Sequence, residues 1–208
     1  QYLLSKSYAY GVTDSYMRTF IHLKELCFNP DSKGCIDEEI STSSQEAHVN
    51  RALNVWGSGK SHTTYFKHID KYVIDIFNKP IEQQPKGIAD MGCGDGSFLY
   101  HLNDLVRNKT LRGTLLDSHP LFLIGADFNQ AALDETSKMF SKSKNKPMTV
   151  LADISKPDEY DKKIKLEYSQ DISNFLNVRS FLDHNRTYKK ELSSILYNFK
   201  NITSNSFV

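Results

Sequence analysis

Apolar positions in the second part of the chain form short continuous runs that alternate with stretches of helical spacing. The runs cover residues 87–89, 121–127 and 148–153, and a fourth, weaker one lies within 172–182. Continuous apolar runs of this length are typical of parallel strands that are buried on both faces. Strands that alternate with helices predict βαβ units. The expected fold is therefore α/β, with a Rossmann-like, doubly wound, mostly parallel sheet.

Helical spacing also marks the N-terminal part of the chain. Between residues 63 and 77 the apolar side chains recur at a period of 3.6 and predict a strong amphipathic helix. A weaker pattern after Gly11 predicts another helix through residues 16–23. We therefore divide the chain into a helical lid or substrate-selecting region, residues 1–80, and a main domain, residues 81–208. A last helix is expected at 187–199.

Composition narrows the possible partners. The 208 residues carry a net charge of +1, which gives no electrostatic reason to expect nucleic acid or an anionic membrane as partner. No apolar run approaches the length of about 20 residues that a membrane span needs. Three cysteines without paired C-x-x-C spacing fit a reducing, cytoplasmic protein. No cluster of His, Cys and acidic residues has the spacing of a metal site, and the oligomeric state is left open.

A glycine-rich loop follows the first predicted strand. Residues 90–96 read Asp-Met-Gly-Cys-Gly-Asp-Gly, and a helical pattern begins directly after them. Strand, glycine loop and helix together present backbone N–H groups to a ligand. The third glycine comes one residue earlier than in the dinucleotide fingerprint G-x-G-x-x-G. Asp90 and Asp95 would repel a pyrophosphate, so they favour a ligand that carries a cation.

Acidic residues follow three successive predicted strands. Asp90, Asp127 and Asp153 each stand at the carboxyl end of an apolar run. This is the edge at which open α/β sheets bind ligands. The structural alternative is that each aspartate caps the helix that follows it. Three acids in register with a glycine loop favour a binding site.

A second glycine-containing stretch, residues 54–62, ends in Gly59-Lys60-Ser61 like a Walker A motif. The first glycine of that motif would stand at position 54, which is an asparagine, and no apolar strand precedes it. The stretch is therefore not expected to bind ATP through a P-loop.

Residues 90–96, 125–129 and 151–154 resemble the motifs of class I S-adenosylmethionine-dependent methyltransferases. More narrowly, residues 85–96, 110–113 and 175–186 resemble methyltransferase domains associated with bacterial polyketide synthases. The resemblance covers about residues 50–188. It implies a seven-stranded sheet whose last strands pair antiparallel. Residues 189–208 are too few to supply the remaining strands, so we expect this domain to be incomplete at its C-terminus.

The resemblance implies S-adenosylmethionine as methyl donor and S-adenosylhomocysteine as product. Asp90 and the loop would face the amino-acid part of the donor, and Asp127 would accept hydrogen bonds from both ribose hydroxyls. Phe128 and Asn129 would flank the adenine, whose amino group would be near Asp153 and Ile154. The predicted cofactor residues are Asp90, Gly92, Cys93, Gly94, Asp95, Gly96, Asp127, Phe128, Asn129, Asp153 and Ile154.

Methyl transfer to carbon or oxygen also calls for a general base. The first candidate is His184, which Asp183 could orient while Arg186 holds an acidic group of the substrate. The second is His62, in a segment that could fold over the cofactor, and Tyr65 is a third. The expected reaction is C- or O-methylation of a small-molecule or carrier-bound, polyketide-like acceptor. The alternatives are a non-catalytic S-adenosylmethionine-binding interaction module and, less favoured, an NAD-linked dehydrogenase.

Overall fold

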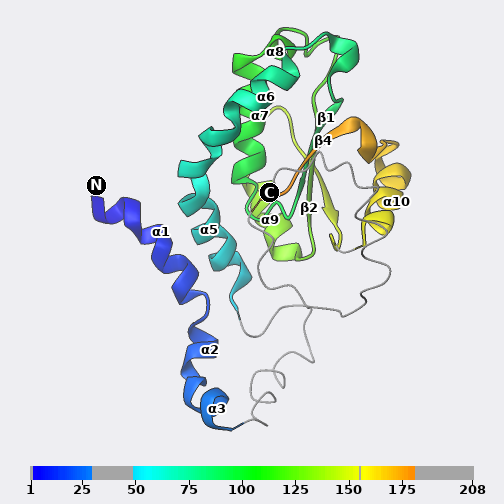
Figure 1. Cartoon of the computed structure of the whole chain (residues 1–208). Helices are drawn as coiled ribbons and strands as arrows, with labels where there is room; N and C mark the ends of the chain where they lie inside the picture. The colour runs from blue at the N-terminus through cyan, green and yellow to red at the C-terminus, as the bar shows by residue number, and fades with distance from the viewer. Residues whose placement is uncertain (1, 30–48, 155, 181–208) are drawn as a thin grey trace, which may run out of the picture.

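The computed structural model describes residues 2–29, 49–154 and 156–180 (Figure 1). Within these residues, four parallel strands form one sheet in the order β3-β2-β1-β4. The strands are β1 (Gly87–Met91), β2 (Phe122–Asp127), β3 (Met148–Leu151) and β4 (Phe175–Val178). The chain moves outward from β1 to β3 and then returns to the other side of β1. The predicted α/β, Rossmann-like and doubly wound fold class is confirmed.

Helices cover both faces of the sheet (Figure 1). One face packs against α6 (Asp70–Phe77), α7 (Ser97–Lys109) and α9 (Gln130–Met139), and the other against α10 (Pro157–Tyr168). Side chains alternate across a strand, so Ile88 joins the first apolar layer and Ala89 the second. Both are fully buried. Burial on both faces explains why the strands are continuous apolar runs in the sequence.

The helix predicted at 63–77 is longer and broken. Helix α5 (Arg51–Phe66) begins well before residue 63, and a 3-10 turn (Lys67–Ile69) separates it from α6. The Asn50 side chain caps its start by accepting a hydrogen bond from the Leu53 N–H. The stretch that ends like a Walker A motif is therefore the middle of a helix. Its glycines and polar residues hide the apolar period on which the prediction depended.

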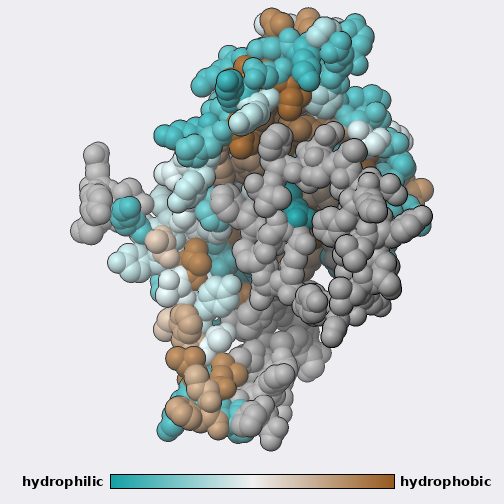
Figure 2. All heavy atoms as spheres, in the orientation of Figure 1, coloured by the Kyte–Doolittle hydropathy of each residue, from teal (hydrophilic) through white to brown (hydrophobic). Residues whose placement is uncertain are grey.

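Three further helices form an N-terminal arm, namely α1 (Tyr2–Asp14), α2 (Met17–Ile21) and α3 (Leu23–Phe28). Helix α1 packs on α5 so closely that a Cβ at Gly57 would lie 2.8 Å from the Tyr8 carbonyl oxygen. Helix α1 runs through Gly11, which the sequence did not predict, whereas the helix predicted at residues 16–23 is present as α2 and α3, interrupted at His22. The arm extends from the body, with apolar side chains at its lower end (Figures 1 and 2). Several of those side chains are exposed, including Ile21 at 71% and Phe28 at 83%.

The predicted polar loop at 107–119 contains a short helix, α8 (Leu111–Thr114), and a buried charge. Arg112 is 4% exposed, and its guanidinium donates hydrogen bonds of 2.9 Å to the carbonyl oxygens of His119 and Pro120. Longer bonds of 3.4 Å reach the Pro85 and Lys86 carbonyls. Arg112 therefore ties together the chain segments that lead into β1 and β2.

Two short 3-10 helices complete the described elements, Ile81–Gln83 before β1 and Ile172–Asn174 before β4. None of the helices that the structure describes combines the length and apolar character needed to cross a membrane. The predicted helix at 187–199 lies outside the described residues.

Candidate functional site

The glycine loop forms a tight turn between β1 and α7. The Gly92 and Cys93 N–H groups both donate to the Ala126 carbonyl oxygen, at 2.7 and 2.9 Å, which ties the loop to β2. Gly96 begins α7 with a left-handed backbone, at φ 77°. A Cβ there would also lie 2.9 Å from Thr136 Cγ2. The early position of the third glycine is thus set by the turn into α7 and by contact with α9.

Asp127 ends β2 beside this loop and is 9% exposed. Its Oδ2 accepts a hydrogen bond from the Gly94 N–H at 3.2 Å, and its Oδ1 accepts one from the Asn129 N–H at 3.0 Å. Burial raises the pKa of Asp127, and these two bonds act in the opposite direction. A carboxylate offers about four acceptor positions. Asp127 can therefore still accept hydrogen bonding from a ligand.

A hollow lies at the carboxyl edge of the sheet, where β1, β2 and β3 end. Its wall is mostly apolar, with one carboxylate and one phenol: Met91, Gly92, Ala126, Asp127, Phe128, Ala152, Ile154 and Tyr160. The predicted cofactor residues Gly92, Asp127, Phe128 and Ile154 thus come together around one space. This is the place at which ligands bind in open α/β sheets.

Asp90 is the most unusual group near the hollow. It is 1% exposed, and its Oδ1 has no hydrogen-bond partner among the described residues. Burial raises the pKa of Asp90 to about 8, and the carboxylates of Asp127 and Asp95 add to the effect. A cation bound nearby would stabilise the ionised form. The predicted preference for a cationic ligand therefore fits this arrangement.

The stability of the ligand-free protein should report the state of Asp90. The pKa of Asp90 is about 8 in the folded protein, against 3.8 for an ordinary carboxyl group. Between these two pH values, the folded state therefore holds a proton that the unfolded state has lost. The free energy of unfolding should fall as pH rises from 4 to 8, by up to about 1.4 kcal/mol per pH unit from this group. Urea denaturation at several pH values measures this dependence, and the free energy of unfolding of Asp90→Asn should fall less steeply with pH than that of the wild type. Equal slopes would contradict the prediction.

Three other predicted cofactor residues make side-chain contacts within the protein itself. Asp95 Oδ1 accepts from the Ser97 N–H at 2.9 Å and its Oδ2 accepts from the Ser97 hydroxyl at 2.8 Å, so it caps the start of α7. Asn129 caps α9 through the Ala131 N–H. The Cys93 side chain is buried, and its Sγ lies 3.4 Å from the Thr136 hydroxyl oxygen. Asp95 and Asn129, which are not among the three strand-end aspartates, thus have helix-capping roles, and Cys93 offers a ligand only its backbone.

Helix α5 lies along the glycine loop. A Cβ at Gly59 would overlap the Asp95 carboxylate, so the helix backbone rests directly on that side chain. At the start of α5, the Arg51 guanidinium lies 5.9 Å from the centre of the Phe128 ring. The helix therefore runs from the end of β2, at Phe128, to the glycine loop that follows β1. Sequence reasoning missed these contacts, because only the folded chain brings residues 51–59 to the loop.

Replacing Gly59 with alanine should destabilise the protein. In an ordinary helix interior this change stabilises by up to about 1 kcal/mol. Here the new methyl group meets Asp95, which Ser97 holds in place, and overpacking of this kind costs about 1–3 kcal/mol. Thr64→Ala, at an exposed position of α5, is the control and should change stability by less than about 0.5 kcal/mol. A Gly59→Ala protein as stable as the wild type would contradict the close contact.

Of the two histidine candidates for the general base, the structure describes only His62. His62 lies on α5 with its Nδ1 3.2 Å from the Ser58 hydroxyl, and it is not part of the described wall of the hollow. His184, with Asp183 and Arg186, lies outside the described residues. Asp153 is not among the residues that line the hollow, although the next residue, Ile154, is. Among the described residues, no cluster of His, Cys and acidic side chains could hold a metal ion. Both histidine assignments stay predictions.

The parallel sheet, the glycine loop and the carboxylates at its edge define an α/β protein of the Rossmann-like class. The chain belongs to the family of AprA MT2-like domains, a methyltransferase family whose sequence model matches residues 46–207. This membership confirms the predicted resemblance to methyltransferase domains associated with polyketide-type synthases. A search of curated proteins gives no match.

Proposed function

We propose that this protein transfers a methyl group from S-adenosylmethionine to a carbon or oxygen atom of a small-molecule or carrier-bound, polyketide-like acceptor. Family membership supports methyl transfer in general. The choice of donor depends on one observation: two buried carboxylates, Asp90 and Asp127, flank a glycine loop beside an apolar hollow.

The residues present fit this donor part by part. Asp127 keeps acceptor capacity beyond its bonds to the Gly94 and Asn129 N–H groups, which suits the ribose hydroxyls. Phe128 and Ile154 belong to the apolar wall that would receive the adenine. Asp90, without a partner at Oδ1 in the described part of the chain, would be stabilised in its ionised form by the ammonium group.

Bound there, S-adenosylmethionine supplies a methyl group activated by the positive charge of its sulphur. The work of the protein is then mainly to position the reactants. The glycine loop and Asp127 fix the nucleoside part, and α5 covers the loop from the side of the N-terminal arm. A general base from His184 or His62 would accept the proton of the acceptor.

Calorimetric titration tests the donor directly. S-adenosylmethionine and S-adenosylhomocysteine should both bind, with dissociation constants on the order of micromolar, while NADH should not. Tight binding of NADH, or no binding of either sulphur compound, would contradict the proposal. Transfer of radiolabelled methyl groups to acyl-thioester acceptors then tests whether the bound donor is used.

A further inference from the structure

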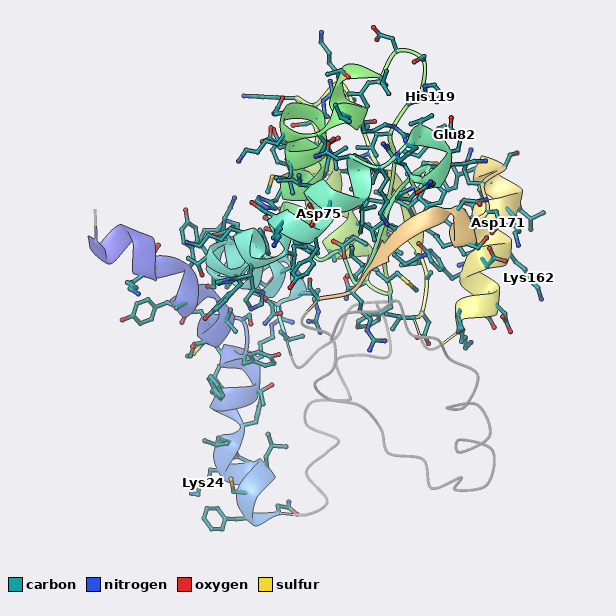
Figure 3. The ribbon with its side chains drawn as sticks, turned by 45° about the horizontal axis from the view of Figure 1, so that its top comes forward. Lys24, Asp75, Glu82, His119, Lys162 and Asp171 are labelled. Atoms are coloured by element: carbon teal, nitrogen blue, oxygen red, sulfur yellow. The ribbon has the colours of Figure 1, made fainter. Side chains whose placement is uncertain are left out.

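Tyr160 carries a polar group that the fold of the described residues does not use. It lies on the inner side of α10, 2% exposed, while Lys162 on the same helix points outward (Figure 3). The ring packs with Ala89, Ala126 and Val150 on the sheet. Its hydroxyl is buried without a hydrogen-bond partner in the part of the chain that the structure describes. Buried hydroxyls are normally hydrogen-bonded, so this one needs an explanation.

Packing alone does not call for the hydroxyl. Phenylalanine would fill the same apolar layer without burying an unpaired oxygen, which destabilises a folded protein. Tyr160 also belongs to the wall of the hollow, together with Phe128 and Ile154. Among the residues that line the hollow, it supplies the one hydroxyl. A polar atom with no partner among the described residues, on a side chain that lines this hollow, can bond to a ligand that enters it.

We propose that the Tyr160 hydroxyl donates a hydrogen bond to a ring nitrogen of the purine base of the methyl donor. This inference rests on the proposed function. The ring nitrogens of adenine are hydrogen-bond acceptors, and the apolar wall around Tyr160 suits a flat ring.

The chemistry of the phenol agrees with a donor role. Burial raises the pKa of Tyr160, and the nearby side chains of Asp90 and Cys93 add to the effect, so the hydroxyl keeps its proton at neutral pH. The oxygen is covered in this structure, so the wall must open slightly for contact. Met91, an unbranched and adaptable side chain in that wall, can give way.

The variant Tyr160→Phe tests the proposal through two effects of opposite sign. Its dissociation constant for S-adenosylhomocysteine, measured by calorimetry, should rise about 3- to 15-fold, the effect of one lost hydrogen bond. The melting temperature of the free protein should stay equal or rise by about 2–4 °C, because an unpaired buried hydroxyl is removed. A purely structural hydroxyl would lower the melting temperature and leave the affinity unchanged.

Tyr168→Phe is the matched control on the same helix. The Tyr168 hydroxyl donates to the Thr149 carbonyl oxygen at 3.2 Å, so its removal should lower the melting temperature slightly and leave ligand affinity unchanged. Adenosine, which has the base and ribose but no amino-acid part, should lose affinity for Tyr160→Phe by the same factor as S-adenosylhomocysteine. A loss seen with S-adenosylhomocysteine alone would overturn the assignment to the base.

The Asp127→Asn variant separates this inference from the proposed function. If the wild type binds S-adenosylhomocysteine and Asp127→Asn binds it poorly, the site is confirmed. Unchanged affinity of Tyr160→Phe would then overturn the role of Tyr160 alone. If the wild type binds neither S-adenosylhomocysteine nor adenosine, the proposed function and the inference both fail.

Discussion

Replacing Asp127 with alanine should lower the affinity for S-adenosylmethionine by about 30- to 1,000-fold, or on the order of 2–4 kcal/mol. The carboxylate is buried at the end of β2 and lines the hollow, where we propose that it accepts hydrogen bonds from both ribose hydroxyls. A hydrogen bond to a charged acceptor contributes more than a neutral one, and alanine removes two at once. Calorimetric titration of both proteins measures the difference.

Alanine also removes the bonds that Asp127 makes to the Gly94 and Asn129 N–H groups, so it could loosen the loop. Asp127→Asn keeps the size of the side chain and one acceptor oxygen, and it should show a smaller loss of affinity than alanine. Asp134→Ala, an exposed acid on α9, should bind like the wild type. If Asp127→Ala folds and binds S-adenosylmethionine with unchanged affinity, Asp127 is not a cofactor residue.

Replacing Arg112 with methionine should destabilise the protein by about 3–5 kcal/mol, because a buried hydrogen-bond network is broken. Methionine fills part of the space but donates no hydrogen bond. The carbonyl oxygens of His119 and Pro120 would lose their 2.9 Å bonds, and the Gln84 side chain would lose a 3.2 Å contact. Urea denaturation measures the loss, and the melting temperature should fall by on the order of 10 °C.

Two further variants serve as controls for this prediction. Arg112→Lys keeps the charge but cannot reach several carbonyl groups at once, so it should remain clearly less stable than the wild type. Arg107→Ala, at an exposed position near the end of α7, should change stability by less than about 0.5 kcal/mol. If Arg112→Met loses no more stability than Arg107→Ala, the guanidinium does not join β1 to β2.

The sequence by itself determined the parallel sheet and the edge at which its glycine loop and acidic residues stand. Strands buried on both faces must be apolar throughout, so residues 121–127 identify β2 without any other part of the chain. The loop at 92–96 needs left-handed backbone at its glycines, which makes it visible in the sequence. Parallel strands put their carboxyl ends at one edge, so Asp90 and Asp127 could be placed near each other before the fold was known.

Only the tertiary structure decided how the rest of the chain meets that edge. Arg112 reads as a surface charge in a polar stretch, yet backbone carbonyl groups from other segments make its burial favourable. Gly59 and Asp95 are far apart in the sequence, and their contact shows why α5 has a glycine there. The unpaired hydroxyl of Tyr160 depends on what α10 packs against. Local sequence patterns reveal backbone preference and burial. Contacts between residues that are distant in the sequence form only when the chain folds, so these patterns do not reveal them.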